Sequence, residues 1–361
     1  MSYYGENSRF VLSDSFCEPL SGKNFSAEDS VAFGKALSHE FKKIAVSFDS
    51  QTSVFQTLAM CAGISESGCT AFICPDTNMS ALKYCLNLID ADCGVFISEH
   101  SSPKFKLIRK NGFSFSKNSM ENLICEKNSC INVSPGEIIT VSSMNQLYIQ
   151  NLKSIFSLEK LPVNAGISCG NSQIRLLWKN FFAGNEESFV FHVSDDGQSV
   201  NGFDIKNGFI SYERLILAYC LIFADKSNEI YLPDWFHFSA EKIADSYGIY
   251  IKRFNAYSEI IPENAAKQRF LIDPLFMCLK LSQNMDKLSH VLSEIPKFVV
   301  IKRDIPLPEK ESSLIGSSFS EKNSRISIQR NGKNTLALVI QSHDAETAAE
   351  IAEDWNMKLK S

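Results

Sequence analysis

Short apolar segments alternate with helix-length segments through residues 43–98, and no other feature constrains the fold as much. The sequence predicts strands over 43–48 (KIAVSF), 70–74 (TAFIC) and 94–98 (GVFIS), with one helix ending at Ala62 and another over 78–90. Alternation at this spacing is typical of βαβ units, whose strands form a mostly parallel sheet. A further helix is predicted over 26–41, because Ser26 and Asp29 have the spacing of a capping box.

The same layout of strand, polar turn and helix occurs twice more along the chain. The predicted copies are a strand over 165–169 with a helix over 174–182, and a strand over 229–232 with a helix over 239–247. We interpret the three copies as related α/β units, similar in layout rather than in sequence. The last part differs, because strands near 298–301, 324–329 and 336–341 and a helix over 345–358 indicate a small α+β domain.

Composition excludes several classes of partner and location. The net charge is -5 and no long Lys/Arg cluster occurs, so neither nucleic acid nor an anionic membrane is expected as a partner. The longest apolar run, 215–224, is too short to span a bilayer and predicts a buried helix. Eleven cysteines without a C-x-x-C pair, and an N-terminus without a signal pattern, predict free buried thiols in the cytoplasm. A disulfide between Cys125 and Cys130 is the alternative.

A dense polar loop follows the strand over 94–98. Ser98-Glu99-His100-Ser101-Ser102 places three hydroxyls, one carboxylate and one imidazole within five positions, and Pro103 closes the loop. A buried strand that leads into a polar loop is a common way to build an active site. Two other histidines, His192 and His237, lie beside apolar strands and are predicted to be core residues rather than ligands.

In their order and spacing, several segments resemble the phosphoglucomutase/phosphomannomutase family, the α-D-phosphohexomutases. The resemblance covers nearly the whole chain. GVFISEHSSPKF resembles the family's phosphoserine segment, FVFHVSDDGQSVNGFDIKNGFISYERL the segment with the D-G-D-x-D-R metal loop, and ISIQRNGKNTLALVIQ the last domain with its R-P-S-G-T-E-P phosphate loop. KIAVSFDSQTSVFQTLAMCAGISESGCTAFICP resembles the first strand, the R-D-T-R-type loop and the helix that follows.

The resemblance implies an α/β protein with three α/β/α mixed-sheet domains and a small α+β C-terminal domain around a central cleft. The domains implied are domain I over 1–145 with its loop 97–103, a shortened domain II over 146–226 with its loop 194–199, a shortened domain III over 227–296 whose sugar loop is deleted, and domain IV over 297–361 with a reduced phosphate loop at 330–335.

The family's chemistry shows what each of these loops would do. A phosphoserine passes its phosphoryl group to a sugar phosphate, and magnesium held by three aspartates neutralises the phosphoserine during transfer. In this chain His100 stands at the phosphoserine position, and Ser194, Asp196 and Gln198 stand at the three metal positions. One carboxylate and an amide would hold magnesium poorly, because this ion needs anionic oxygens to give up water.

Each candidate site residue therefore has two interpretations. His100, or Ser101 or Ser98 after a small shift, would accept a phosphoryl group, or the loop is degenerate. Asp195 and Asp196 would form a weak cation site, or a tight turn between strands. Arg330, Lys333 and Thr335 would bind phosphate, or form the solvated tip of a hairpin.

Three hypotheses for the function follow. The preferred one is a non-catalytic phosphohexomutase relative that binds a phosphosugar or other phosphorylated small molecule, or a protein partner, and needs no cofactor. The second is an active, magnesium-dependent phosphotransferase of the mutase (isomerase) type with His100 or a neighbouring serine as the altered acceptor. The third is an interaction or assembly protein, because a shortened domain II is expected to expose a sheet edge.

Overall fold

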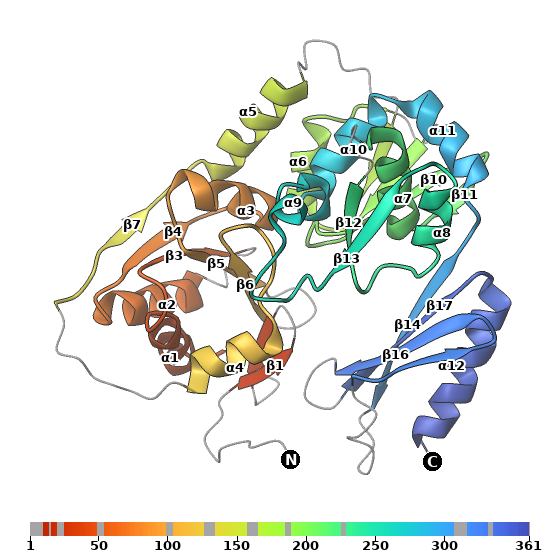
Figure 1. Ribbon diagram of the computed structural model, residues 1–361. Helices are drawn as coiled ribbons and strands as arrows, with labels where there is room; N and C mark the ends of the chain where they lie inside the picture. Colours follow the sequence, from red (N-terminus) through yellow and green to blue (C-terminus); the bar gives the residue numbers. More distant parts are fainter. Residues whose placement is uncertain are drawn as a thin grey trace. The chain divides into compact units, whose positions relative to one another are not determined.

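The computed structural model describes residues 10–13, 16–19, 25–48, 54–98, 104–125, 134–156, 165–184, 189–224, 229–306, 316–330 and 335–360. The chain divides into two compact units, which are described separately (Figure 1). The first unit comprises Met1–Val200 and Asn255–Ser282, and the second comprises Asn201–Phe254 and Gln283–Ser361.

The first unit is built on a seven-stranded mixed sheet. Its strands, in spatial order, are β1 (Phe10–Ser13), β2 (Phe16–Pro19), β6 (Lys104–Arg109), β5 (Cys93–Ser98), β3 (Lys43–Phe48), β4 (Thr70–Cys74) and β7 (Ile138–Thr140). The neighbouring strands β5, β3, β4 and β7 pair in parallel. At the other end of the sheet, β6 pairs antiparallel with β5 and β2, and β2 pairs antiparallel with β1. The predicted βαβ units are confirmed, and the antiparallel strands make the sheet mixed.

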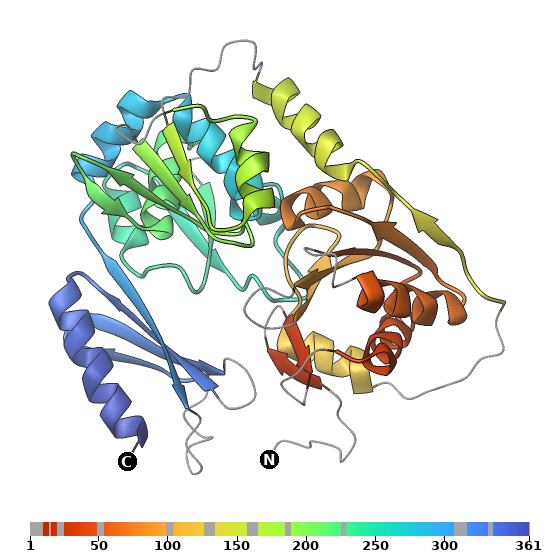
Figure 2. The same cartoon turned by 180° about the vertical axis from the view of Figure 1, so that it is seen from behind.

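Helices cover both faces of this sheet (Figure 1 and Figure 2). On one face, side chains of α1 (Ala27–Leu37), α2 (Val54–Glu66) and α4 (Lys117–Cys125) share a buried cluster with Val46 and Val95. On the other face, α3 (Met79–Leu88) and the start of α5 (Met144–Phe156) pack with Ala45 and Phe96. Neighbouring residues of one strand thus enter opposite cores, as the two-residue period of a strand requires.

Glycine lets the first two helices approach unusually closely. A Cβ on Gly34 would lie 2.3 Å from the Met60 carbonyl oxygen, and a Cβ on Gly63 would lie 2.3 Å from the Val31 carbonyl oxygen. The predicted capping box is confirmed, because Ser26 and Asp29 exchange side-chain and backbone hydrogen bonds at the start of α1.

The rest of the first unit contains β8 (Ala165–Ser168), α6 (Ser172–Lys179) and β9 (Phe189–Val193), with β8 and β9 parallel, and then α9 (Glu263–Ala266), a 3₁₀ turn at Arg269–Leu271 and α10 (Pro274–Ser282). Asp273 connects this last segment to α5. It accepts hydrogen bonds from the Tyr148 hydroxyl (2.6 Å) and the Arg269 Nε (2.9 Å). The segment 255–282 therefore packs on the N-terminal sheet domain and not only with its neighbours in sequence.

The second unit begins with a hairpin and a buried helix. Its elements are β10 (Val200–Asp204), β11 (Gly208–Ile210), α7 (Tyr212–Phe223), β12 (Glu229–Pro233), α8 (Ala240–Asp245), β13 (Tyr250–Phe254) and α11 (Met285–Glu294). The apolar run over 215–224 forms most of α7, and residues 214–220 are buried, as predicted. Buried Arg214 donates to the carbonyl oxygens of Leu292 and Ile295 and ties α7 to the end of α11.

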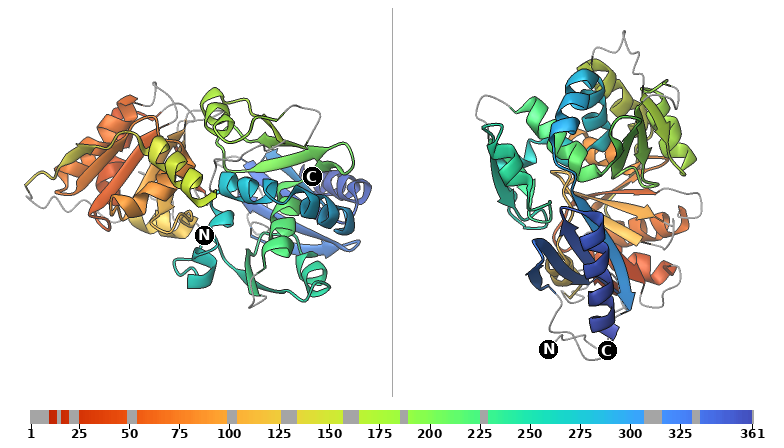
Figure 3. Two further views of the ribbon diagram at one scale, coloured as in Figure 1. Left: turned by 90° about the horizontal axis from the view of Figure 1, so that it is seen from above. Right: turned by 90° about the vertical axis from the view of Figure 1, so that its right-hand side faces the viewer.

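The C-terminal part of the second unit is a four-stranded antiparallel sheet with one helix. The order is β14 (Val299–Pro306), β17 (Thr335–Ser342), β16 (Ser324–Arg330) and β15 (Ser318–Glu321). Figure 3 shows α12 (Ala345–Lys360) lying along this sheet, where Ile351 and Trp355 pack on Ile326 and Leu338. The predicted small α+β domain is confirmed.

Two smaller expectations have opposite outcomes. His237 is fully buried, as predicted, but the prediction for His192 was wrong because its side chain is exposed. Phe191 and Val193 are buried on one face of β9, and His192 lies on the opposite face, where Val190 is buried but His192 itself is exposed. No helix in the described part of the chain is long and apolar enough to cross a membrane.

The four domain boundaries and the central cleft stay predictions. The alternative of a Cys125–Cys130 disulfide also stays a prediction, because it lies outside the described side chains.

Candidate functional site

The loop 194–199 follows β9 and forms a hydrogen-bonded turn in the first unit. The Ser194 N–H donates to the Ser199 carbonyl (3.0 Å), and the Gly197 N–H donates to the Ser194 carbonyl (2.8 Å). Gly197 has a φ of +70°, a conformation that favours glycine. The backbone of the loop is therefore fixed locally, and its side chains have defined directions.

Asp196 has both carboxylate oxygens engaged. Its Oδ1 accepts from the Ser194 hydroxyl (2.7 Å) and the Gln198 backbone N–H (3.0 Å), and its Oδ2 pairs with the Lys106 Nζ (2.9 Å). Burial would raise the pKa of this carboxyl, but Lys106 and the two hydrogen bonds outweigh it and lower the pKa to about 2. Asp196 is thus a stable, fully coordinated carboxylate.

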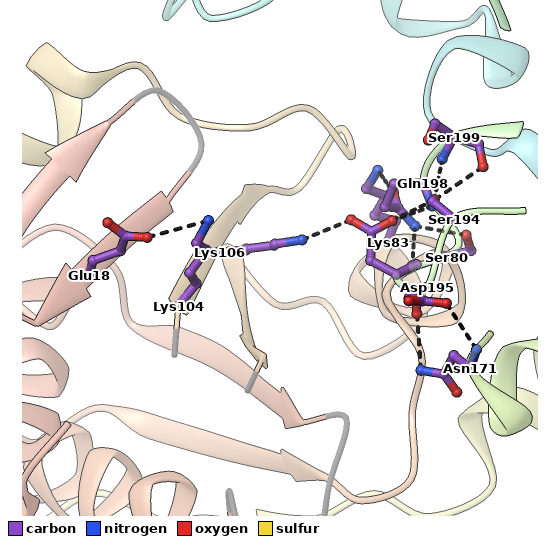
Figure 4. A network of polar contacts seen from close by, with 11 residues as sticks. Glu18, Ser80, Lys83, Lys104, Lys106, Asn171, Ser194, Asp195, Gln198 and Ser199 are labelled. Carbon is purple, nitrogen blue, oxygen red and sulfur yellow. Dashed lines mark hydrogen bonds and ion pairs between the residues drawn. The ribbon is translucent and has the colours of Figure 1, made fainter. Parts of the chain in front are cut away.

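A second lysine reaches the same loop from another element. The Lys83 Nζ, on α3, donates to the Gln198 Oε1 (2.5 Å) and to the Ile272 carbonyl (3.2 Å), as Figure 4 shows for Gln198. The Gln198 Nε2 in turn donates to the Ser80 hydroxyl (3.3 Å). Burial lowers the pKa of Lys83 to about 8, although Asp273 and Asp196 favour its charged form.

Asp195 contacts Asn171 and takes no part in the lysine contacts described for Asp196 and Gln198. Its Oδ1 accepts from the Asn171 N–H (3.0 Å), and its carbonyl accepts from the Asn171 Nδ2 (3.0 Å) (Figure 4). Asn171 also caps the start of α6. A Cβ on Gly170 would lie 2.6 Å from the Asp195 Oδ1, so glycine is needed for this close contact. Asp195 therefore joins the loop 194–199 to the start of α6.

A hollow of about 290 Å³, which includes open solvent, lies beside these carboxylates in the first unit. Its apolar wall contains Phe48, Phe96 and Ile174. Its polar lining consists of Thr77, Asn78, Asn171, Gln173, Asp195 and Asp196. Since Phe96 lies on β5, the strand that precedes residues 99–103 borders the same hollow as the two aspartates.

The three residues that the sequence resemblance predicts at metal positions do not fit a magnesium ion. Ser194 donates its hydroxyl to Asp196, Asp196 is paired with Lys106, and the Gln198 side-chain oxygen accepts from Lys83. Within the described part of the chain, no group of three or more His, Cys, Asp or Glu residues is placed to hold a metal. Magnesium needs near-octahedral oxygen ligands, usually with a carboxylate free to bind.

The remaining predicted site residues are only partly described. Ser98 is the last residue of β5 and is buried. His100, Ser101 and Lys333 lie outside the described residues. Arg330 ends β16 and Thr335 begins β17, but their side chains lie outside what the structure describes. The roles assigned to these residues stay predictions.

Sequence reasoning missed Lys83 and Lys106. Lys83 stands in an otherwise apolar part of its helix, near Leu82 and Cys85, and that position was a signal of an internal partner. Lys106 carried no comparable signal, because alternating lysines on a strand near a sheet edge are ordinary. Its partner Asp196 lies 90 residues away in sequence.

Known proteins resemble this chain in structure and not measurably in sequence. No protein-family model matches the sequence, and no curated protein matches it. A phosphoglucomutase/phosphomannomutase family protein from Burkholderia thailandensis matches with a TM-score of 0.68 at 12% identity, covering 96% of each chain. A candidate phosphomannomutase from Thermus thermophilus matches with a TM-score of 0.63 at 11% identity, covering 90% of this chain and 93% of that one.

An N-acetylglucosamine-phosphate mutase, a member of the α-D-phosphohexomutase superfamily solved in its substrate complex, matches with a TM-score of 0.51 at 10% identity. This match covers 97% of the present chain and 96% of that one. Identities this low concern the fold alone. The chain therefore has the fold of the α-D-phosphohexomutase superfamily over nearly its whole length.

Proposed function

We propose that this protein keeps the phosphohexomutase fold but has lost mutase activity. The observation that carries the proposal is the state of Asp196. It is the one carboxylate at the three aligned metal positions, and both of its oxygens are engaged inside the protein. A divalent ion would have to displace Lys106 and find its other anionic ligands elsewhere.

Phosphoryl transfer depends on neutralising the charge that spreads over the transferring group. In the family this is done by magnesium beside the phosphoserine, and here the aligned loop offers neither three carboxylates nor a serine at the position of His100. The turn that resembles R-D-T-R also has no arginine, since it consists of Phe48, Asp49, Ser50 and Gln51. Loss at several loops together favours a non-catalytic protein.

A phosphorylated small molecule remains the proposed ligand. Arg330, Lys333 and Thr335 keep cationic and hydroxyl donors at the position of the family's phosphate loop. Binding without turnover would need no metal, so we expect it to be unaffected by a chelator.

The nine described free cysteines are all buried, which supports the proposed location in the reducing cytoplasm.

A coupled assay with glucose 1-phosphate or mannose 1-phosphate and magnesium tests the proposal. We expect no turnover above the blank, with an active phosphohexomutase as the positive control. Intact-mass measurement after incubation with a sugar bisphosphate should show no added phosphoryl group. Turnover that is lost in His100→Ala or Ser101→Ala, together with a phosphorylated species, would instead establish the altered-acceptor enzyme.

Assembly is a second candidate, favoured by the β10–β11 hairpin of the second unit. Phe203 (43% exposed), Ile205 (84%) and Phe209 (62%) all expose large apolar side chains, and Phe203 lies directly opposite Phe209 in the hairpin register. Among the described strands β11 pairs with β10 alone. An exposed apolar edge strand is normally covered by another segment.

Light scattering coupled to size-exclusion chromatography tests assembly over a range of concentrations. A dimer that dissociates in Phe203→Ser/Phe209→Ser would support a role in assembly. A monomer at every concentration, with unchanged behaviour of the variant, would remove the support that the hairpin gives.

A further inference from the structure

Two lysines from different elements converge on the loop 194–199 in the first unit. Lys106 extends from β6 to Asp196. Lys83 extends from α3 to Gln198, as Figure 4 shows. Asp196 and Gln198 are two of the three positions aligned with the family's metal ligands. The third, Ser194, donates its hydroxyl to Asp196. All three positions therefore belong to one network that contains two ammonium groups.

The charge balance of this network differs from that of a metal site. Three aspartates with one divalent cation would carry a net charge of about -1 at the ligand positions. Here the ligand positions hold one carboxylate, which pairs with Lys106, and one amide oxygen, which accepts from Lys83, so each is already in contact with an ammonium group. A divalent cation added beside Lys106 and Lys83 would be repelled, because like charges interact more strongly in a partly buried site than in water.

The two ammonium groups also join separate segments of the chain, as a bound metal ion does. A metal ion joins segments that are distant in sequence by accepting ligands from each of them. Lys106 connects β6 to the loop, and Lys83 connects α3 to the loop and to the Ile272 carbonyl. Each lysine donates directional hydrogen bonds from a tetrahedral ammonium group to a side-chain oxygen of the loop, where a metal ion would form coordination bonds.

We infer that the ammonium groups of Lys106 and Lys83 have taken the place of the divalent cation and hold the loop 194–199 as built-in cations. This inference rests on the proposed function only for the equivalence of this loop with the family's metal loop. It concerns what holds the loop, so it predicts the behaviour of the folded protein with no substrate present. Magnesium should neither bind at this loop nor stabilise the native protein.

The neighbouring lysine on β6 provides a matched control. Lys104 is two residues from Lys106, pairs with Glu18 at 3.3 Å, and has a similar side-chain exposure of 27%, compared with 22% for Lys106. Both lysines are replaced by methionine, which keeps the stem and removes the charge. Glu18 belongs to β2 and not to the loop 194–199, so the two variants lose their ion pairs to different elements.

Thermal unfolding of the full-length chain separates the two variants. We expect Lys106→Met to lower the unfolding midpoint by roughly 3–8 °C, since it leaves Asp196 without its counter-charge, and Lys104→Met to lower it by at most about 2 °C. The midpoint of the native protein should be the same in millimolar magnesium and in EDTA. Equal shifts in the two variants would overturn the inference.

A variant that removes both lysines and restores three carboxylates at the ligand positions tests the inference in the opposite direction. In the variant Lys83→Met/Lys106→Met/Ser194→Asp/Gln198→Asp, three carboxylates stand at the ligand positions with no lysine beside them. Magnesium should then raise the unfolding midpoint, by several degrees at a concentration about 100-fold above its dissociation constant. A folded variant that does not respond to magnesium would contradict the replacement.

Calorimetric titration of magnesium into the native protein and into Asp196→Asn decides the matter if the fourfold variant does not fold. We expect no saturable binding in either protein. Saturable binding to the native protein that Asp196→Asn abolishes would show that the ion displaces Lys106 and would overturn the inference. Mutase turnover would refute the proposed function, whereas these unfolding and binding measurements would stand by themselves, so the two failures are distinguishable.

Discussion

The loop 194–199 and the hairpin formed by β10 and β11 follow each other in sequence but differ in how completely their side chains are paired. In the loop, the polar side chains of Ser194, Asp196 and Gln198 all bond within the protein, and lysines supply the opposite charge. In the hairpin, Phe203 and Phe209 expose apolar surface. The polar side chains of the loop have hydrogen-bond and ion-pair partners within the protein. The hairpin instead has an exposed apolar surface that a partner would cover.

This difference shows how a loop with a partly buried carboxylate can be stable when its partners all come from the protein itself. A buried carboxylate left without its cation would destabilise the native state, because an uncompensated charge is costly to bury. Lys106 removes that cost at Asp196. Predictions that unbalance the loop should therefore change stability, whereas predictions aimed at the hairpin should change association.

The largest expected effect comes from Asp196→Ala. It leaves Lys106 without its counter-charge, removes the acceptor of the Gln198 N–H, and leaves the Ser194 hydroxyl only the Ser199 carbonyl as acceptor. We expect the free energy of unfolding in urea to fall by about 3 kcal/mol. The adjacent Asp195→Ala, which removes one acceptor of Asn171, should cost only about 1 kcal/mol. Equal losses would show that Asp196 has no special place in the network.

A smaller effect is expected from the pH dependence of the same pair. The pKa of Asp196 is lowered to about 2 in the folded state, against 3.8 for an ordinary aspartate. The unfolded chain therefore binds more protons between these values, and the stabilisation is complete above about pH 4 and lost as the pH falls to about 2. The stability difference between the native protein and Asp196→Asn should shrink by about 1–2 kcal/mol over this window in urea titrations. A pH-independent difference would contradict the ion pair.

Gly170→Ala should have a comparable or slightly smaller effect on the loop. The added Cβ would meet the Asp195 Oδ1 at 2.6 Å and push this carboxylate off the Asn171 N–H. We expect a loss of about 1–2 kcal/mol in the free energy of unfolding. In the Asp195→Ala background Gly170→Ala should add little further loss, because the carboxylate that its Cβ would meet is gone, so the double variant should lose about as much stability as Asp195→Ala alone. If the losses of Gly170→Ala and Asp195→Ala simply add in the double variant, the Cβ that Gly170→Ala introduces does not act through the Asp195 carboxylate.

The smallest effect on stability is expected in the hairpin. Phe203→Ser and Phe209→Ser replace side chains that are already exposed, so each should change the free energy of unfolding by no more than about 0.5 kcal/mol. If the hairpin mediates assembly, the same variants should weaken association in sedimentation experiments. A large loss of stability would mean that the two rings belong to the core, and the contrast with the loop would fail.

Local sequence patterns predicted much of the fold. Ser26 and Asp29 predicted a helix start because a capping box is formed within four residues, and the apolar run KIAVSF predicted a buried strand. Such signals are local, so no tertiary contact is needed to detect them. His192 escaped the prediction because nothing in the sequence says which single position of the apolar strand β9 is left uncovered.

The candidate site was harder to predict, since its partners come from separate elements. Asp196 could be singled out from its loop, but Lys106 is 90 residues away and Lys83 is 115 residues from Gln198. A single sequence does not pair positions across such separations. The predicted roles of His100 and Lys333 depend on segments outside the described residues, so they stay predictions.

The pKa of the Asp196 side chain, measured by carbon NMR with labelled aspartate in the presence and absence of magnesium, tests the central claim most directly. Because Lys106 holds this carboxylate, its pKa should be about 2 in both conditions, and its chemical shift should not respond to magnesium. A pKa near the ordinary 3.8, or a resonance that moves as magnesium is added, would show that the carboxylate is free for a metal and would contradict the account.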